Sequence, residues 1–287
     1  ATSLFQMGTS VGNMIAPPLV AFCILAWNWQ AAFIVTGALS LLWAGLWWTG
    51  YRDPGEHPRL SAEERAVIES GRNDELPGKP ATKRDVLQSR SFWAIAVPRF
   101  LSEPAWQTFN FFIPLYLVAV WNLDLKSIAL WAWLPFLAAD FGSLAAGLLP
   151  TWLMKPNRFS SQGVSLIASR KITMTLGALC MIGPACIGLA TSPGVAIALF
   201  CIGGFAHQML NGALITLCAD VFDARTVGTA SGMAGTSAWI GGMLFTLLIG
   251  QSADQFGYNP LFVALAALDL LAAGVLWVLL RERFAKA

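Results

Sequence analysis

Long apolar runs separated by polar segments dominate this 287-residue chain. A helix needs ~20 mostly apolar residues to cross a bilayer, and eight runs are long enough. They lie at 4–26, 31–50, 92–120, 127–154, 170–190, 194–219, 228–251 and 259–280. The pattern predicts an all-α polytopic membrane protein with eight transmembrane helices.

The composition agrees with this fold class. Hydrophobic residues make up 56% of the chain and charged residues 12%, about half the charged share of soluble proteins. Several of the 13 tryptophans, such as Trp47, Trp121 and Trp277, lie near the ends of the runs, as in an interfacial belt. All five cysteines lie inside runs at no metal-ligand spacing. We interpret them as small apolar residues of the helix contacts and expect no metal site.

The basic residues lie almost entirely in every second polar segment. Eight of the 18 are in 51–90, four are in 150–171 and three end the chain, whereas Lys126 is alone in the opposite set of segments. Basic loops stay on the cytoplasmic side of a membrane. The chain is therefore expected in the bacterial inner membrane, with both of its termini cytoplasmic.

The polar stretch 51–90 separates two runs from the other six. Ser61 and Glu64 have the spacing of a capping box, which predicts a short helix over 61–71. We interpret 51–90 as a solvated cytoplasmic linker.

An internal repeat suggests how the runs are grouped. Gly8-Thr9-Ser10 in the first run recurs as Gly235-Thr236-Ser237 in the seventh, six runs later. Two six-helix halves related by a parallel repeat would produce this displacement. Residues 1–50 are then the last two spans of an N-terminal bundle, and 91–287 form a six-span C-terminal bundle. On this interpretation the chain carries eight of twelve helices and is truncated at its N-terminus.

Ionisable residues inside an apolar run are functional candidates, because each costs about 2.5–3.5 kcal/mol on insertion scales. Arg99 and Glu103 are four residues apart, so they share a helix face and can pair. Trp106 and Asn110 continue this stripe. Two interpretations stay open: contact with a substrate, or a structural ion pair between helices.

Two later runs also contain polar groups. Asp140 either relays a proton or accepts hydrogen bonds from a neighbouring helix. His207 and Asn211 share a helix face with Gln208 beside it, and these residues are either ligand contacts or hydrogen-bonded packing residues. Glu103, Asp140 and His207 are the candidates for proton coupling or gating. Asp269, without a visible partner, is expected to have a packing or interfacial role.

The first run adds Gln6, Ser10 and Asn13 as candidate substrate contacts. We find no phosphate-binding glycine loop with its lysine, no metal-ligand cluster and no Ser/His/Asp arrangement. These observations favour a protein that is not an enzyme and does not bind nucleic acid. A membrane enzyme using His207 and Asp140 is a minor alternative.

Taken together, these motifs resemble the anion:cation symporter branch of the major facilitator superfamily, specifically bacterial hexuronate, galactonate and glucarate transporters. The resemblance covers essentially the whole chain. Its most specific segments are Phe5 to Pro17, Arg99-Phe100-Leu101-Ser102-Glu103-Pro104, Leu137 to Ser143, Ala206-His207-Gln208 and Gly241 to Phe245.

The resemblance implies a proton-driven symporter of sugar-acid anions that works by alternating access. Its partners would be a small organic anion, H⁺ and the lipid bilayer. It would be a monomer and would need no cofactor beyond the proton gradient. The alternative is a truncated or decayed symporter without transport activity.

Overall fold

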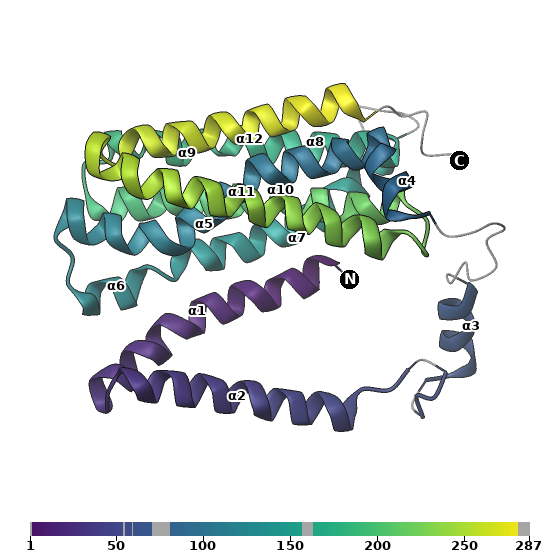
Figure 1. Cartoon of the computed structure of the whole chain (residues 1–287), viewed down its shortest axis with the longest axis horizontal. Coiled ribbons are helices and arrows are strands. Elements are labelled where there is room, and N and C mark those ends of the chain that lie inside the picture. Colours follow the sequence, from purple (N-terminus) through teal and green to yellow (C-terminus); the bar gives the residue numbers. More distant parts are fainter. Residues whose placement is uncertain (1, 54, 59, 71–80, 157–162, 281–287) are drawn as a thin grey trace. The chain divides into compact units, whose positions relative to one another are not determined.

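The computed structural model describes residues 2–53, 55–58, 60–70, 81–156 and 163–280, and its regular elements there are all helical. In chain order they are α1 (Thr2–Ala26), α2 (Trp29–Gly50), α3 (Ala62–Ser70), α4 (Lys83–Gln88), α5 (Arg90–Trp121), α6 (Leu125–Trp131), α7 (Leu134–Met154), α8 (Leu166–Cys180), α9 (Ile182–Ala185), the 3-10 helix η1 (Cys186–Leu189), α10 (Pro193–Val221), α11 (Val227–Phe256) and α12 (Asn259–Leu279) (Figure 1). Contacts divide the chain into one unit of Ala16–Pro80 and another of Ala1–Ile15 with Ala81–Ala287.

Helices occupy all eight predicted ranges, but two of them are not single helices. The run 127–154 is divided between α6 and α7, and Pro135 lies in the first turn of α7, where its missing N–H costs nothing. The run 170–190 is interrupted after α8 and continues as α9 and η1. Pro184 lies in α9 and cannot donate a backbone hydrogen bond, which explains part of this irregularity.

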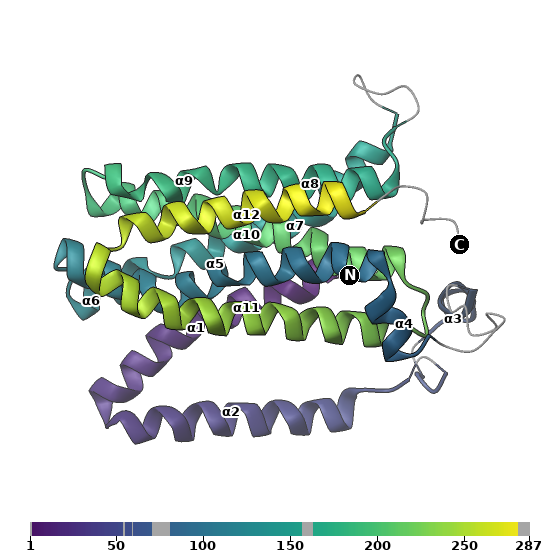
Figure 2. The same cartoon turned by 45° about the horizontal axis from the view of Figure 1, so that its top comes forward.

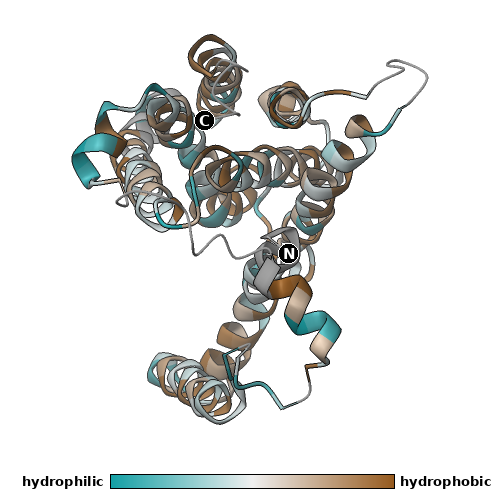
Figure 3. Cartoon of the chain, turned by 90° about the vertical axis from the view of Figure 1, so that its right-hand side faces the viewer, coloured by the Kyte–Doolittle hydropathy of each residue, from teal (hydrophilic) through white to brown (hydrophobic). Residues whose placement is uncertain are grey.

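Apolar surface is consistent with a membrane location. Among the described residues, five helical segments are long and apolar enough to cross a bilayer; they are Trp29–Gly50, Leu134–Met154, Leu166–Leu189, Pro193–Val221 and Asn259–Leu279. Residues of high hydropathy, drawn in brown, recur along the helices (Figure 3), and many large hydrophobic side chains are exposed, such as Leu148, Trp152 and Leu247. The chain is therefore an all-α membrane protein, and the number of eight spans stays a prediction.

Side-chain caps define where several helices begin. The Asn28 side chain accepts a hydrogen bond from the backbone N–H of Ala31 at 2.9 Å, and Ser165 and Ser192 act in the same way at the starts of α8 and α10. Such caps satisfy amide groups that have no partner within the helix. At the other end of a helix, Asn122 ends α5 in the left-handed conformation, with φ of 52°.

The bundle of the larger unit is built around α5 and α10, which contact each other. Helices α7 and α8 pack against α10, whereas α11 and α12 pack against α5, and α12 also contacts α8 (Figures 1 and 2). The contact between α7 and α10 is very close. A Cβ atom at Gly142 would lie 2.1 Å from the carbonyl oxygen of Phe205, and one at Gly204 would lie 2.2 Å from that of Pro135.

The apolar core of this bundle is in two parts. One cluster includes Ile95, Met174, Leu214 and Leu276, and the other includes Phe109, Tyr116, Phe200 and Phe262. Because lipid is as apolar as these side chains, their contribution is close van der Waals contact rather than removal from water. Buried polar residues lie in the stretches of α5, α10 and α12 between the two clusters; they include Ser102, His207 and Asp269.

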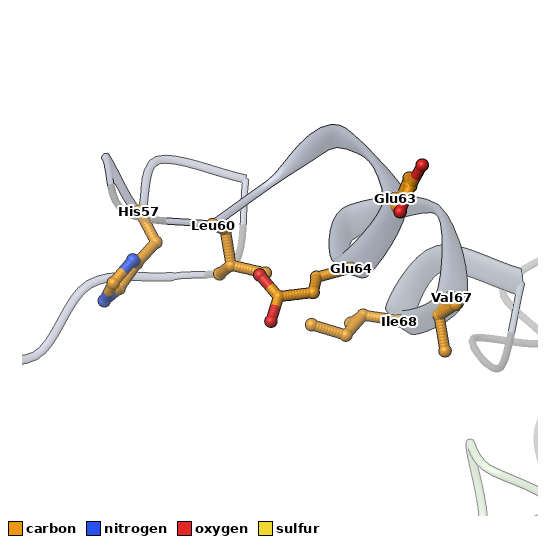
Figure 4. Close-up of a pocket in the computed structure, with 6 residues that line it drawn as sticks. All are labelled: His57, Leu60, Glu63, Glu64, Val67 and Ile68. Atoms are coloured by element: carbon orange, nitrogen blue, oxygen red, sulfur yellow. The ribbon is translucent and has the colours of Figure 1, made fainter.

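The linker contains the predicted helix, α3. Ser61 and Glu64 exchange the two hydrogen bonds of a capping box, each at 3.1 Å. A shallow groove beside α3 is lined by His57, Leu60, Glu63, Glu64, Val67 and Ile68 (Figure 4). The Glu64 carboxylate already accepts the Ser61 N–H, and the groove is otherwise largely apolar, so we assign no substrate to it. Residues 71–80 of the linker lie outside the described part of the chain.

Helix α4 was not predicted from the sequence. Thr82 and Asp85 form a second capping box at its start. These hydrogen bonds from Thr82 lower the pKa of Asp85 below its ordinary value, because they favour the charged carboxylate.

We expect Gly142→Ala and Gly204→Ala each to destabilise the protein by about 1–3 kcal/mol, because the added methyl group would overlap a backbone carbonyl that cannot rotate away. Thermal unfolding in detergent measures this effect. Gly274→Ala is the matched control, since a Cβ atom there would meet no other atom within 4 Å. Equal stability of the three variants would contradict the close contact between α7 and α10.

Candidate functional site

The polar stripe predicted on α5 is present and continuous. Arg99, Trp106 and Asn110 are half-buried, while Glu103 and the neighbouring Gln107 are buried. Three prolines lie within this helix, and each removes one backbone donor. Helix α5 therefore presents charged, amide and aromatic groups from within the membrane-spanning bundle.

Glycines of α11 allow Glu103 and Gln107 to be buried. A Cβ atom at Gly242 would lie 2.9 Å from Cγ of Gln107 and 3.2 Å from Cγ of Glu103. One at Gly241 would lie 2.1 Å from the Phe100 carbonyl oxygen. Two small residues thus bring the backbone of α11 close to the acidic part of the stripe.

The predicted pairing of Arg99 with Glu103 is not a direct ion pair among the described residues. The two charges interact electrostatically, but the buried Nε of Arg99 has no hydrogen-bond partner there. Glu103 instead accepts a hydrogen bond from Gln107 at 3.4 Å. The arginine therefore keeps donor capacity that a ligand carboxylate can use.

Helix α10 contributes a buried histidine that stacks on an aromatic ring. The His207 ring is stacked on Trp106, with centroids 5.5 Å apart and planes 15° apart. Phe136 of α7 meets Trp106 edge to face at 5.8 Å. His207 is 0% exposed, and neither ring nitrogen has a hydrogen-bond partner in the part of the chain that the structure describes.

The amide side chains of the site form hydrogen bonds with groups on their own helices. Asn211 donates a hydrogen bond to the Gln208 side chain at 3.4 Å, and Asn110 donates to the carbonyl of Trp106 at 2.8 Å. Asn110 and Asn211 are half-buried, whereas Gln208 is buried. These short-range bonds orient the amides without using all of their donors and acceptors.

Asp140 lies on α7, which carries Phe136 four residues earlier. It is buried and lies two residues from Gly142, where α7 and α10 approach most closely. The buried Ser143 hydroxyl nearby has no hydrogen-bond partner among the described residues. The structure thus joins α5, α7 and α10 through aromatic contacts and a close helix crossing.

Of the candidates on α1, only Asn13 has a described side chain, since those of Gln6 and Ser10 lie outside the described residues. Asn13 is half-buried, and among the described residues no hydrogen bond or ion pair connects its side chain to α5 or α10.

Charged side chains also pair where α8 begins and α10 ends. Arg170 and Asp220 form an ion pair with Nε and Oδ2 at 2.7 Å. In the loop after α10, a hydrogen bond from Thr226 lowers the pKa of Asp223 below its ordinary value. No group of three or more metal-ligating side chains occurs within the described ranges.

Several members of this arrangement were not selected from the sequence. Phe136 is apolar within an apolar run, and only its spacing of four from Asp140 gave a signal. Gly242 was noted as part of a family motif, but its contact with Glu103 depends on how α11 crosses α5. The structure thus supplied the pairings between helices.

Comparison with known sequences identifies the family. The sequence model described as Major Facilitator Superfamily matches residues 1–169 and 160–287. The chain is 49% identical to the hexuronate transporter of Escherichia coli (strain K12) over 286 residues, which are 99% of this chain and 65% of that protein. It is 48% identical to the galacturonate transporter of Dickeya chrysanthemi over 201 residues, 69% of this chain and 57% of that protein.

A more distant relative is the probable L-galactonate transporter of Escherichia coli (strain K12). The two are 31% identical over 209 residues, 69% of this chain and 44% of that protein. Each of these matches therefore spans less than two thirds of the relative's length.

The chain belongs to the Major Facilitator Superfamily, a family of membrane transporters and not of enzymes. The alternative of a membrane enzyme using His207 and Asp140 was therefore wrong. The resemblance to sugar-acid transporters is confirmed by the relatives. Truncation at the N-terminus stays a prediction.

We expect Trp106→Ala to make His207 reactive toward diethyl pyrocarbonate, because the substitution uncovers one face of the imidazole. The chain has two histidines, His57 and His207. A His57→Asn background therefore isolates the signal, which mass spectrometry detects. Trp93→Ala, a substitution of an exposed tryptophan on the same helix, is the control. Equal labelling of the parent and Trp106→Ala would contradict the stacked arrangement.

Proposed function

We propose that this chain acts in proton-coupled symport of a sugar-acid anion of the hexuronate type. The observation that carries the proposal is the half-buried Arg99, on the same helix as Glu103 and Trp106, in a chain that is 49% identical to a hexuronate transporter. A cation inside a membrane-spanning bundle needs an anionic partner, and no direct ion pair occupies Arg99 among the described residues.

Each part of the site suits a different part of such a substrate. Arg99 can bind the carboxylate with two parallel hydrogen bonds. Trp106 offers an aromatic face to the C–H groups of the sugar ring, and the amides of Gln208, Asn110 and Asn211 suit its hydroxyl groups. Gln6, Ser10 and Asn13 would face the substrate from the other half of the transporter.

Proton coupling is assigned to the ionisable groups Glu103, Asp140 and His207. All three are buried, so a change in their charge is costly unless a counter-charge arrives with it. Simultaneous binding of an anion and a proton keeps the total charge of the site constant. The proton gradient is then the only energy source required, and no cofactor is involved.

The arrangement of the chain follows from the same proposal. Residues 1–50 supply the last two spans of an N-terminal bundle, 51–90 are a cytoplasmic linker and 91–287 form the C-terminal bundle. The protein acts as a monomer in the bacterial inner membrane by alternating access, with both ends of this chain in the cytoplasm.

Uptake of radiolabelled galacturonate into cells or energised vesicles tests the proposal. We expect uptake to rise as the external pH falls and to stop when a protonophore is added. Unlabelled glucuronate should compete, whereas galactose should not, because it lacks the carboxylate that Arg99 would bind. Uptake that ignores pH and protonophore would refute proton coupling. Absence of any uptake by correctly inserted protein would favour the non-transporting alternative.

We expect Arg99→Gln to raise the KM for galacturonate about 10- to 100-fold, because hydrogen bonds to charged groups contribute ~1.5–3 kcal/mol. Arg99→Lys should lose less, since it keeps the charge but not the two-pronged geometry. Lys126→Gln, which removes an exposed charge outside the bundle interior, is the control. An unchanged KM in Arg99→Gln at equal expression would remove Arg99 from the binding site.

A further inference from the structure

Helix α12 contains a carboxyl group that the proposed transport site does not use. Asp269 is 0% exposed, and neither of its oxygens has a hydrogen-bond partner among the described residues. Its neighbours on the same face of α12 are Leu265, Ala266, Ala272 and Ala273, which are all buried. An ionised carboxylate in such surroundings would be extremely costly.

The contacts of α12 locate Asp269 along α8 and α9. Trp277 donates a hydrogen bond to Thr175, and Gly188 lies against Asn259. Because the two segments run in opposite directions between these contacts, interpolation along them places Asp269 near Met181. Met181 is the residue at which α8 ends and α9 begins.

The same reasoning locates Asp269 along α5. Arg90 donates a hydrogen bond to the carbonyl of Leu279 at 2.9 Å, and the ring of Tyr116 lies 5.9 Å from that of Phe262. Asp269 therefore faces the segment of α5 between Arg90 and Tyr116, which contains Pro98, Pro104 and Pro114. Each proline lacks a backbone N–H, so this segment has fewer backbone hydrogen bonds than a regular helix.

No charged group among the described residues is paired with Asp269. The titratable side chains on the neighbouring elements at this depth or next to it are Arg99, Glu103 and Tyr116 of α5, Lys171 and Cys180 of α8 and Cys186 of η1. None of them forms a hydrogen bond with the carboxyl.

The basic side chains near the cytoplasmic end of α12 bond to groups other than Asp269. Arg90 and Lys171 donate to the last carbonyls of α12, and Arg170 pairs with Asp220. Arg99 and Glu103 belong to the stripe of α5 that meets α10 and α11, whereas Asp269 approaches α5 from α12. The carboxyl is therefore separate from the proposed substrate site.

We propose that Asp269 is a proton-binding site, occupied in this conformation, where α12 packs against α5 and α8. A bound proton makes the carboxyl neutral, which allows it to lie in a core without a counter-charge. Loss of that proton would oppose the contact of α12 with α5, because the resulting carboxylate would have to reach water or a cation. The inference does not depend on the proposed transport function.

Infrared difference spectroscopy of the purified protein at neutral pH tests this site. Subtracting the spectrum of Asp269→Asn from that of the parent should leave the carbonyl stretch of a protonated carboxylic acid. Asp85→Asn is the matched control: Asp85 is exposed and capped by Thr82, which favours its ionised form, so this subtraction should leave only carboxylate bands.

A carboxylate band in the Asp269 difference spectrum, without an acid band, would overturn the proposal. If Asp269→Asn does not fold, Asp269→Glu provides the second measurement. It should keep the acid and shift its carbonyl band, and an unshifted acid band would likewise overturn the assignment. Neither spectrum requires transport activity, so a failure here is distinct from a failure of the uptake experiments.

Discussion

Close approach of helix backbones is the constraint on which the rest of this structure depends. At Gly142, Gly204 and Gly241, a single added carbon would lie 2.1–2.2 Å from a carbonyl oxygen of the facing helix. A bilayer supplies little hydrophobic force between helices, so this close packing of helix backbones is a main source of stability. The same contacts hold α7 against α10 and α11 against α5, and so determine which polar side chains are enclosed.

Burial of side chains between packed helices explains how such an apolar bundle accommodates its ionisable residues. Glu103 is covered by α11 at Gly242, and His207 is covered by Trp106. Arg99 alone of these three is half-buried, which leaves it available to an anion. The proposed substrate site and the proposed proton site at Asp269 thus differ in kind. The substrate site combines charged and amide side chains, several of which are half-buried. The proton site is a single carboxyl group among buried apolar side chains.

Membership of a transporter family is consistent with a bundle that can change conformation. Three prolines lie within α5, and α8 gives way to α9 and η1 before its run of apolar residues ends. Features of this kind concentrate bending at particular residues. Asp269 belongs to α12, which packs against both of these helices, and this is the reason to connect its protonation with movement of α12.

The fold class, the approximate positions of the long apolar helices and the family could all be predicted from the sequence alone. These properties depend on local signals: runs of about 20 apolar residues, caps such as Ser61 with Glu64, and motifs within single helices. It also selected Arg99, Glu103, Trp106 and His207, because polar residues stand out in an apolar run. The breaks at Trp133 and Met181 were missed, since hydropathy does not register a change of helix geometry.

Only the tertiary structure decided which of these residues meet. The stacking of His207 on Trp106, the use of Gln107 rather than Arg99 as the hydrogen-bond partner of Glu103, and the isolation of Asp269 all depend on how helices cross. Helix crossings are set by the sizes of facing residues that are distant in the sequence, such as Gly242 and Glu103. A single sequence contains no record of that pairing, whereas the periodicity of each helix can be read directly from it.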